Sequence, residues 1–271
     1  MPESDRIIKI LFVGDVVGEP GLKAVDSELP GMLREHEVDF CIVNGENAYE
    51  GKGIRPGDAD RIFTAGAQVI TSGNHIWERW QSKKVLTENP RVLRPLNYPP
   101  GNVGNGWCST RVLETEVIVV NLQGLTFLPD IDCPFRAVDA LLRTFSPTAV
   151  VIVDFHAEAT AEKIAMGRFL DGRVAAVLGT HTHVPTSDAQ IFPKGTAFIT
   201  DVGMTGPYSS VIGMDIDTAI RRFLYKTPYK YETATDDARI ASVLMEIDAS
   251  TRKAISITPL IRPPFITAQG S

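Results

Sequence analysis

Short apolar runs alternate with helix-like stretches along most of this chain of 271 residues. The runs are rich in β-branched residues, as in residues 7–13, 39–43 and 149–153. Such runs predict buried strands, and strands that alternate with helices predict a mainly parallel sheet. The pattern changes towards the C-terminus, where the strand-like segments 241–247 and 254–261 have few helical stretches around them. We therefore expect an α/β fold in which a second sheet packs on the first.

The composition narrows the class of protein. With 44% hydrophobic and 22% charged residues, the chain is typical of a globular protein, and we expect a single domain over residues 1–271. The formal net charge of -6 argues against a strong nucleic-acid platform, because a duplex-binding surface normally carries a basic excess. The first six residues are polar and no apolar run approaches roughly 20 residues, so we expect neither a signal peptide nor a membrane-spanning helix. We expect a cytoplasmic protein without membrane contact.

The cysteines exclude two further kinds of site. There are three of them, Cys41, Cys108 and Cys133, at wide spacings. An odd number of widely spaced cysteines indicates neither a disulfide framework nor a CxxC metal motif. Cys41 lies inside a strand-like run and is interpreted as a small core residue.

Polar residues suited to metal binding or catalysis follow the predicted strands, usually beside a glycine. Open α/β sheets bind their ligands at the carboxyl ends of the strands. The clearest case is His181 and His183, which follow the apolar run 174–178 and Gly179. In extended backbone these two imidazoles would point the same way and reach one point in space. The full set comprises Asp15, Glu46, Asn47, Asn74, His75, His156, His181 and His183.

Taken singly, each of these residues has a structural explanation. An aspartate after a strand is often a turn or capping residue, and Asn-Gly is a turn signal. Their joint occurrence in step with the strands favours one shared site. Mixed imidazole and oxygen ligands suit iron, manganese or zinc. The candidates are too many for one tetrahedral ion, so we expect two ions about 3.5–4 Å apart, bridged by one carboxylate.

The segments that contain these residues resemble the calcineurin-like metallophosphoesterases, and more closely their YmdB-like branch. The segments that carry the resemblance are residues 11–18, 44–48, 71–77, 132–136, 153–160, 179–183 and 200–207. The resemblance implies a four-layer α/β/β/α sandwich of two packed sheets, with a two-metal site at the strand ends.

The resemblance also implies the metal ligands, which are Asp15, Glu46, Asn47, Asn74, His156, His181 and His183. Asp15 and His183 would hold one ion, Glu46 would bridge, and Asn74, His156 and His181 would hold the other. The general family has a histidine two residues after the first aspartate, where this chain has Val17. The YmdB-like branch is thought to use the asparagine after the bridging carboxylate instead, here Asn47. Iron is the preferred metal, with manganese and zinc as alternatives.

The function implied is hydrolysis of a small-molecule phosphodiester, such as the cyclic nucleotide 2′,3′-cyclic AMP. A metal-bound hydroxide would attack phosphorus, and His75 would donate a proton to the leaving group. Two alternatives stay open, since the same metal core serves a phosphomonoesterase or a metal- and nucleotide-binding regulator that acts through a protein or RNA-processing partner. A hydride-transfer enzyme is disfavoured, because residues 14–18 do not form GxGxxG. A homo-oligomer is also left open.

Overall fold

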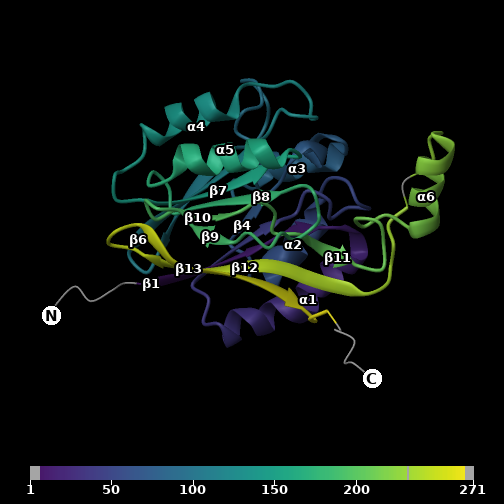
Figure 1. The fold of residues 1–271 in the computed structure, drawn as a ribbon, viewed down its shortest axis with the longest axis horizontal. Coiled ribbons are helices and arrows are strands. Elements are labelled where there is room, and N and C mark those ends of the chain that lie inside the picture. Colours follow the sequence, from purple (N-terminus) through teal and green to yellow (C-terminus); the bar gives the residue numbers. More distant parts are fainter. Residues whose placement is uncertain (1–6, 231, 266–271) are drawn as a thin grey trace.

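The computed structural model describes residues 7–230 and 232–265, in which two β-sheets face each other and helices cover their outer faces (Figure 1). The first sheet has the strand order β2-β11-β12-β1-β3-β4, with β13 paired to β12. Its strands are β1 (Ile7–Val13), β2 (Asp15–Val16), β3 (Phe40–Asn44), β4 (Val69–Thr71), β11 (Met204–Pro207), β12 (Ala238–Asp248) and β13 (Lys253–Arg262). Strands β1, β3 and β4 are parallel, whereas β12 runs antiparallel to both β1 and β13.

The second sheet has the strand order β5-β6-β7-β8-β10-β9. Its strands are β5 (Trp107–Val112), β6 (Thr115–Gln123), β7 (Val150–His156), β8 (Ala176–Thr180), β9 (Gln190–Ile191) and β10 (Ala197–Ile199). The four central strands β6, β7, β8 and β10 are parallel, so their carboxyl ends meet at one edge of the sheet.

The helices form the two outer layers. They are α1 (Gly18–Glu35), α2 (Pro56–Thr64), α3 (Trp80–Glu88), α4 (Pro134–Leu142), α5 (Thr160–Leu170) and α6 (Ile216–Tyr225), with a short 3-10 helix η1 (Asn74–Trp77). Figure 1 shows α4 and α5 over one side of the sandwich, α1 on the opposite side, and α6 projecting from the edge of the molecule. No helix within the described residues is both long and apolar enough to cross a membrane.

Alternating side chains of the strands build the layers. In β1, Ile8, Ile10 and Phe12 belong to the core between the two sheets, whereas Leu11 and Val13 belong to the core between the first sheet and its helices. A third core joins the second sheet to α4 and α5. This period of two is what a strand buried on both faces produces. The expected four-layer α/β/β/α sandwich is confirmed.

Candidate metal centre

The candidate residues gather where the carboxyl ends of strands from both sheets meet; we call them the strand-end cluster. From the first sheet, Asp15 lies in β2 directly after β1, Glu46 and Asn47 follow β3, and Asn74 and His75 begin η1 after β4. From the second sheet, His156 is the last residue of β7, and His181 and His183 follow β8. The cluster thus draws on elements that are far apart in the sequence.

Three hydrogen-bond acceptors converge in the buried part of the cluster. His156 Nε2 lies 3.1 Å from Glu46 Oε1 and 3.0 Å from His181 Nδ1. Ligand atoms of these three residues all lie within 4.8 Å of one another. Glu46 and His156 are fully buried, and the side chain of His181 is 16% exposed.

The hydrogen bonds of His156 fix its tautomer. Asp154 accepts from Asn44 Nδ2 and from the Thr180 hydroxyl, at 3.0 and 2.7 Å. Because the Thr180 proton is used in this way, Thr180 Oγ1 accepts the Nδ1 proton of His156, at 2.9 Å. In the neutral ring, which is the form that ligates metals, the lone pair of His156 is then on Nε2 and faces Glu46 and His181. Such outer hydrogen bonds orient metal-ligating histidines in other proteins.

His181 is oriented in a similar way. Its Nε2 lies 3.0 Å from Glu158 Oε2, so a proton on Nε2 leaves the lone pair on Nδ1, toward His156. Two imidazole nitrogens and a carboxylate oxygen then face one point, where a bound cation would contact all three. A soft-to-borderline metal ion fits this donor set.

Unpartnered oxygens nearby support the same conclusion. Asp15 Oδ1 and Asn74 Oδ1 are buried and have no hydrogen-bond partner among the described residues. The other carboxylate oxygen of Asp15 accepts from the backbone N–H of His181, at 3.1 Å. A buried polar oxygen without a partner is costly, and a bound cation would remove that cost. The residues present therefore fit a metal site.

The outer side of the cluster contains Asn47, His75 and His183. The Asn47 amide nitrogen lies 3.0 Å from Glu46 Oε1 and 3.2 Å from His183 Nε2. The Asn47 oxygen accepts from His75 Nδ1, at 2.8 Å. In this rotamer the amide oxygen is directed at His75, and a half-turn of the amide would direct it towards Glu46 and His183. Ligation by Asn47 stays a prediction.

The backbone around the two histidines after β8 differs from what the sequence predicts. Gly179 and Thr180 still belong to β8, and His181 and His183 have φ angles of 101° and 66°. The expectation that extended backbone points both imidazoles the same way is wrong. Each histidine instead turns to a different neighbour, His181 to His156 and His183 to Asn47 and the carbonyl of Ile212. Non-glycine residues seldom adopt such angles, and the residues that do are concentrated at functional sites.

Charge interactions shift several pKa values. Burial raises the pKa of Asp15, and it raises the pKa of Asp154 to about 7. Burial alone would also raise the pKa of Glu46, but His156 and His75 hold that pKa well below its usual value. Burial opposes charge on His156, yet Glu46 raises the pKa of His156 to about 9, so that without a metal ion Nε2 carries a proton that faces Glu46, in the place that a metal ion would take. Burial and the charge of His156 lower the pKa of His181 to about 3, so His181 is neutral, the form that ligates metals.

Gly73 has no side chain, and this leaves space for two side chains of the cluster. A Cβ atom at Gly73 would overlap the ring of His156 and the carboxylate of Glu46. The space taken by these two side chains therefore requires glycine before Asn74.

Sequence analysis missed several residues that hold the cluster. Thr180 and Asn44 act through Asp154, and Glu158 contacts His181. A signal for Thr180 exists, because it lies between Gly179 and His181 in the same segment. Lys163, which pairs with the buried carboxylate of Asp201, offers no such signal, since a lysine within a helix ordinarily indicates a solvent-exposed face.

Comparisons with known proteins agree with this geometry. Residues 11–260 match the family model described as YmdB-like protein. The chain is 43% identical to the 2′,3′-cyclic-nucleotide 2′-phosphodiesterase of Bacillus subtilis (strain 168), over 94% of this chain and 97% of the relative.

Two solved structures are similar over nearly their whole lengths. A protein from Thermus thermophilus superposes with a TM-score of 0.89 at 42% identity, covering 94% of this chain and 98% of that one. A structure described as a novel phosphatase from Mycoplasma pneumoniae superposes with a TM-score of 0.90 at 35% identity, covering 95% and 94%.

Proposed function

The chain belongs to the family of YmdB-like proteins and is a metal-dependent phosphoric diester hydrolase. From that premise we propose that it uses two metal ions to hydrolyse cyclic nucleotides such as 2′,3′-cyclic AMP. The observation that carries this proposal is the convergence of Glu46, His156 and His181 on one point. The printed activity of the Bacillus subtilis relative supports the choice of substrate.

The strand-end cluster would divide between the two ions. Glu46 would bridge them, His156, His181 and Asn74 would hold one, and Asp15, His183 and Asn47 would hold the other. Imidazole and carboxylate donors suit iron, manganese and zinc. Iron is the metal we propose, with manganese or zinc as alternatives. When bound, such a pair neutralises phosphate charge and lowers the pKa of a bound water.

The side chains of the protein then orient the centre and supply a proton. In the rotamer described above, the amide of Asn47 and the backbone N–H of His75 hold the Glu46 carboxylate, at 3.0 and 3.3 Å. Ligation by Asn47 would require the half-turn of its amide, after which the backbone N–H of His75 alone would hold Glu46. His75 Nδ1 donates to Asn47, which leaves His75 Nε2 on the more exposed side of the ring, 3.5 Å from Glu78. We propose that His75 acts as the imidazolium, with protons on both ring nitrogens, and gives its Nε2 proton to the leaving alkoxide, which leaves a neutral ring with its remaining proton on Nδ1.

Metal content and kinetics on the same preparation test this proposal. We expect close to two ions per chain and faster turnover of bis(p-nitrophenyl) phosphate and 2′,3′-cyclic AMP than of p-nitrophenyl phosphate. His75→Ala should retain the metals and lose about 100-fold or more in kcat, the usual contribution of a general acid. His36→Ala, which removes a histidine at the C-terminal end of α1, is the matched control and should match the wild type.

Other outcomes point to the alternatives. Preference for the monoester would favour a phosphomonoesterase. Metal binding without turnover of any ester, in wild type and His75→Ala alike, would favour a regulator that binds a nucleotide. Fewer than one ion per chain after reconstitution with iron or manganese would overturn the two-metal proposal.

A further inference from the structure

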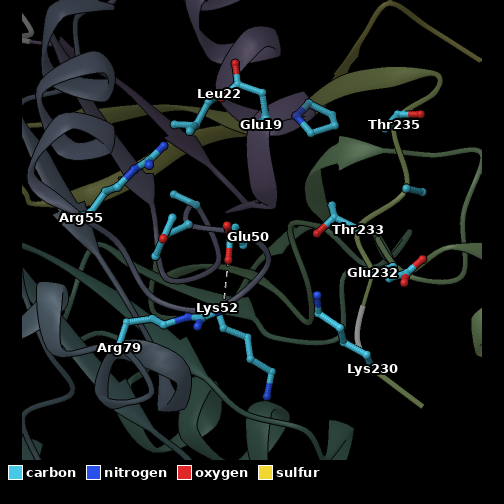
Figure 2. A pocket seen from close by; sticks show the side chains of 14 residues that line it. Glu19, Leu22, Glu50, Lys52, Arg55, Arg79, Lys230, Glu232, Thr233 and Thr235 are labelled. Atoms are coloured by element: carbon cyan, nitrogen blue, oxygen red, sulfur yellow. Dashed lines mark hydrogen bonds and ion pairs between the residues drawn. The ribbon is translucent and has the colours of Figure 1, made fainter.

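A cavity of about 710 Å³ lies beside the strand-end cluster (Figure 2). One wall consists of the start of α1 and the loop from Ala48 to Arg55, and the facing wall consists of residues 230 and 232–235. The lining includes Ala48, the residue directly after Asn47. A ligand with its reacting phosphate at the cluster could therefore extend into this cavity. The volume is typical of small-molecule sites.

Both walls are connected to proposed metal ligands. On one side, the carbonyl of Asn47 accepts from the backbone N–H of Gly18, at 3.0 Å, and Tyr49 follows two residues later. On the other side, His183 Nδ1 donates to the carbonyl of Ile212, at 2.8 Å. The turn that begins there continues to Met214, which forms a β-bridge with Thr233 of the facing wall. The position of the cavity relative to the cluster is therefore set by hydrogen bonds.

The near wall offers a flat, stacked surface. The guanidinium carbons of Arg55 and Arg79 lie 4.6 and 5.3 Å from the centre of the Tyr49 ring. Lys52 pairs with Glu78, at 2.7 Å, and Glu78 in turn lies next to His75. Aromatic rings and arginine planes are the groups on which nucleobases stack.

The far wall offers hydrogen-bond donors and acceptors. In Figure 2, Lys230 extends from this wall towards the side of Glu50 and Lys52, and Glu232 and Thr233 lie beside it. The whole lining contains the cations Lys52, Arg55, Arg79 and Lys230 and the carboxylates Glu19, Glu50 and Glu232. Four cations and three carboxylates give the lining little net positive charge, which disfavours a polyanion as the ligand. The number of charged side chains disfavours an apolar ligand.

We propose that this cavity binds the nucleoside of the substrate, an inference that rests on the proposed phosphodiesterase function. The base stacks on the group formed by Tyr49, Arg55 and Arg79. The polar edges of the base and ribose bond to the facing wall, where Lys230 donates and Glu232 accepts. A nucleoside combines one flat face with several donors and acceptors, which is the combination that the two walls offer.

The test compares two cyclic phosphates that differ only beyond the reacting ring. The ratio of kcat/KM for 2′,3′-cyclic AMP to kcat/KM for glycerol 1,2-cyclic phosphate isolates the contribution of the nucleoside. We expect the wild type to prefer the nucleotide, and Tyr49→Ala to lower this ratio about tenfold, in line with the loss of one base stack. Lys230→Ala should lower it as well.

Two controls separate binding from damage to the fold. Lys83→Ala removes an exposed lysine from α3, outside the cavity, and should leave the ratio unchanged. Tyr49→Phe keeps the ring and should retain most of the ratio. An unchanged ratio in both Tyr49→Ala and Lys230→Ala, or a wild type without preference for the nucleotide, would overturn the proposal.

Failure of the proposed function is recognised separately. If the wild type hydrolyses none of these esters, calorimetric titration with adenosine 3′-monophosphate still tests the cavity. Saturable binding that weakens about tenfold in Tyr49→Ala would support the nucleoside site. Absence of binding would contradict it.

Discussion

The ammonium group of Lys163 lies 2.7 Å from Asp201 Oδ2, and both side chains are almost completely buried. The same carboxylate oxygen accepts from the backbone N–H and the hydroxyl of Thr182, at 3.0 and 2.8 Å. Thr182 lies between His181 and His183, whose backbone angles are unusual. This buried ion pair therefore holds the turn that presents two proposed metal ligands.

Lys163→Met should destabilise the protein by about 3–5 kcal/mol, because it leaves the buried carboxylate of Asp201 without a compensating charge. Denaturant unfolding at neutral pH measures the change. Lys194→Met, at an exposed lysine, is the control and should stay within about 0.5 kcal/mol of the wild type. Equal stability of the two variants would show that the Lys163 pair does not support the turn.

Gly73→Ala should displace His156 or Glu46, since its Cβ atom would overlap both side chains. Overpacking of this kind costs about 1–3 kcal/mol. We expect lower stability and fewer ions per chain, measured by unfolding and by elemental analysis. Gly57→Ala is a suitable control because nothing lies within 4 Å of its added Cβ atom in α2. A Gly73→Ala protein with full metal content would contradict the packing described here.

Thr180→Val removes the hydroxyl through which Asp154 orients His156 and keeps nearly the same shape. Loss of such outer hydrogen bonds typically weakens metal binding about 10–100-fold. Competition with a chelator of known affinity measures the change. Thr110→Val in β5, on a strand at the far edge of the second sheet, should leave metal affinity unchanged. Unaltered affinity in Thr180→Val would exclude this role for the hydroxyl.

The thiols should differ in their pH-dependent reactivity. Burial raises the pKa of the Cys108 thiol to about 11 and raises the pKa of the Cys41 thiol further. Only the thiolate reacts, so labelling of Cys108 should be slow near neutral pH and rise about tenfold per pH unit until the pH approaches that pKa. Cys41 should react only after unfolding.

Mass spectrometry after timed labelling checks the order of reaction. Cys108→Ser should remove only the labelling assigned to Cys108 and leave the labelling of the other thiols unchanged. Rapid labelling of Cys41 in the native protein would contradict its position inside β3.

Much of the sandwich is predictable because its strands are buried on both faces. The expected strand 7–13 coincides with β1, and the expected strands 39–43 and 149–153 overlap β3 and β7. Their apolar content is local information, so no knowledge of the neighbouring elements is needed to recognise them. The clustering of polar residues at strand ends follows from the same pattern.

Features that depend on contacts between distant segments were not predictable. His181 and His183 have positive φ angles, and Thr182 between them donates to Asp201, which no local pattern links to that turn. Lys163 is buried only because the same carboxylate lies opposite it. Helix α6 was also missing from the predicted elements, although the sequence contains a signal for it. Asp215 accepts from the backbone N–H of Thr218 as a helix cap, and apolar residues recur at helical spacing after it.

The strand-end cluster joins residues of both sheets, so a cation bound there would act as a cross-link between the two halves of the sandwich. Asp15 and His181, which meet at this point, are 166 positions apart in the chain. A ligand present at a hundredfold excess over its Kd stabilises the folded state by about 2.7 kcal/mol. The same ion would therefore take part in catalysis and stabilise the packing of the two sheets. A chelator that removes it should abolish hydrolysis and weaken the contact between the sheets together.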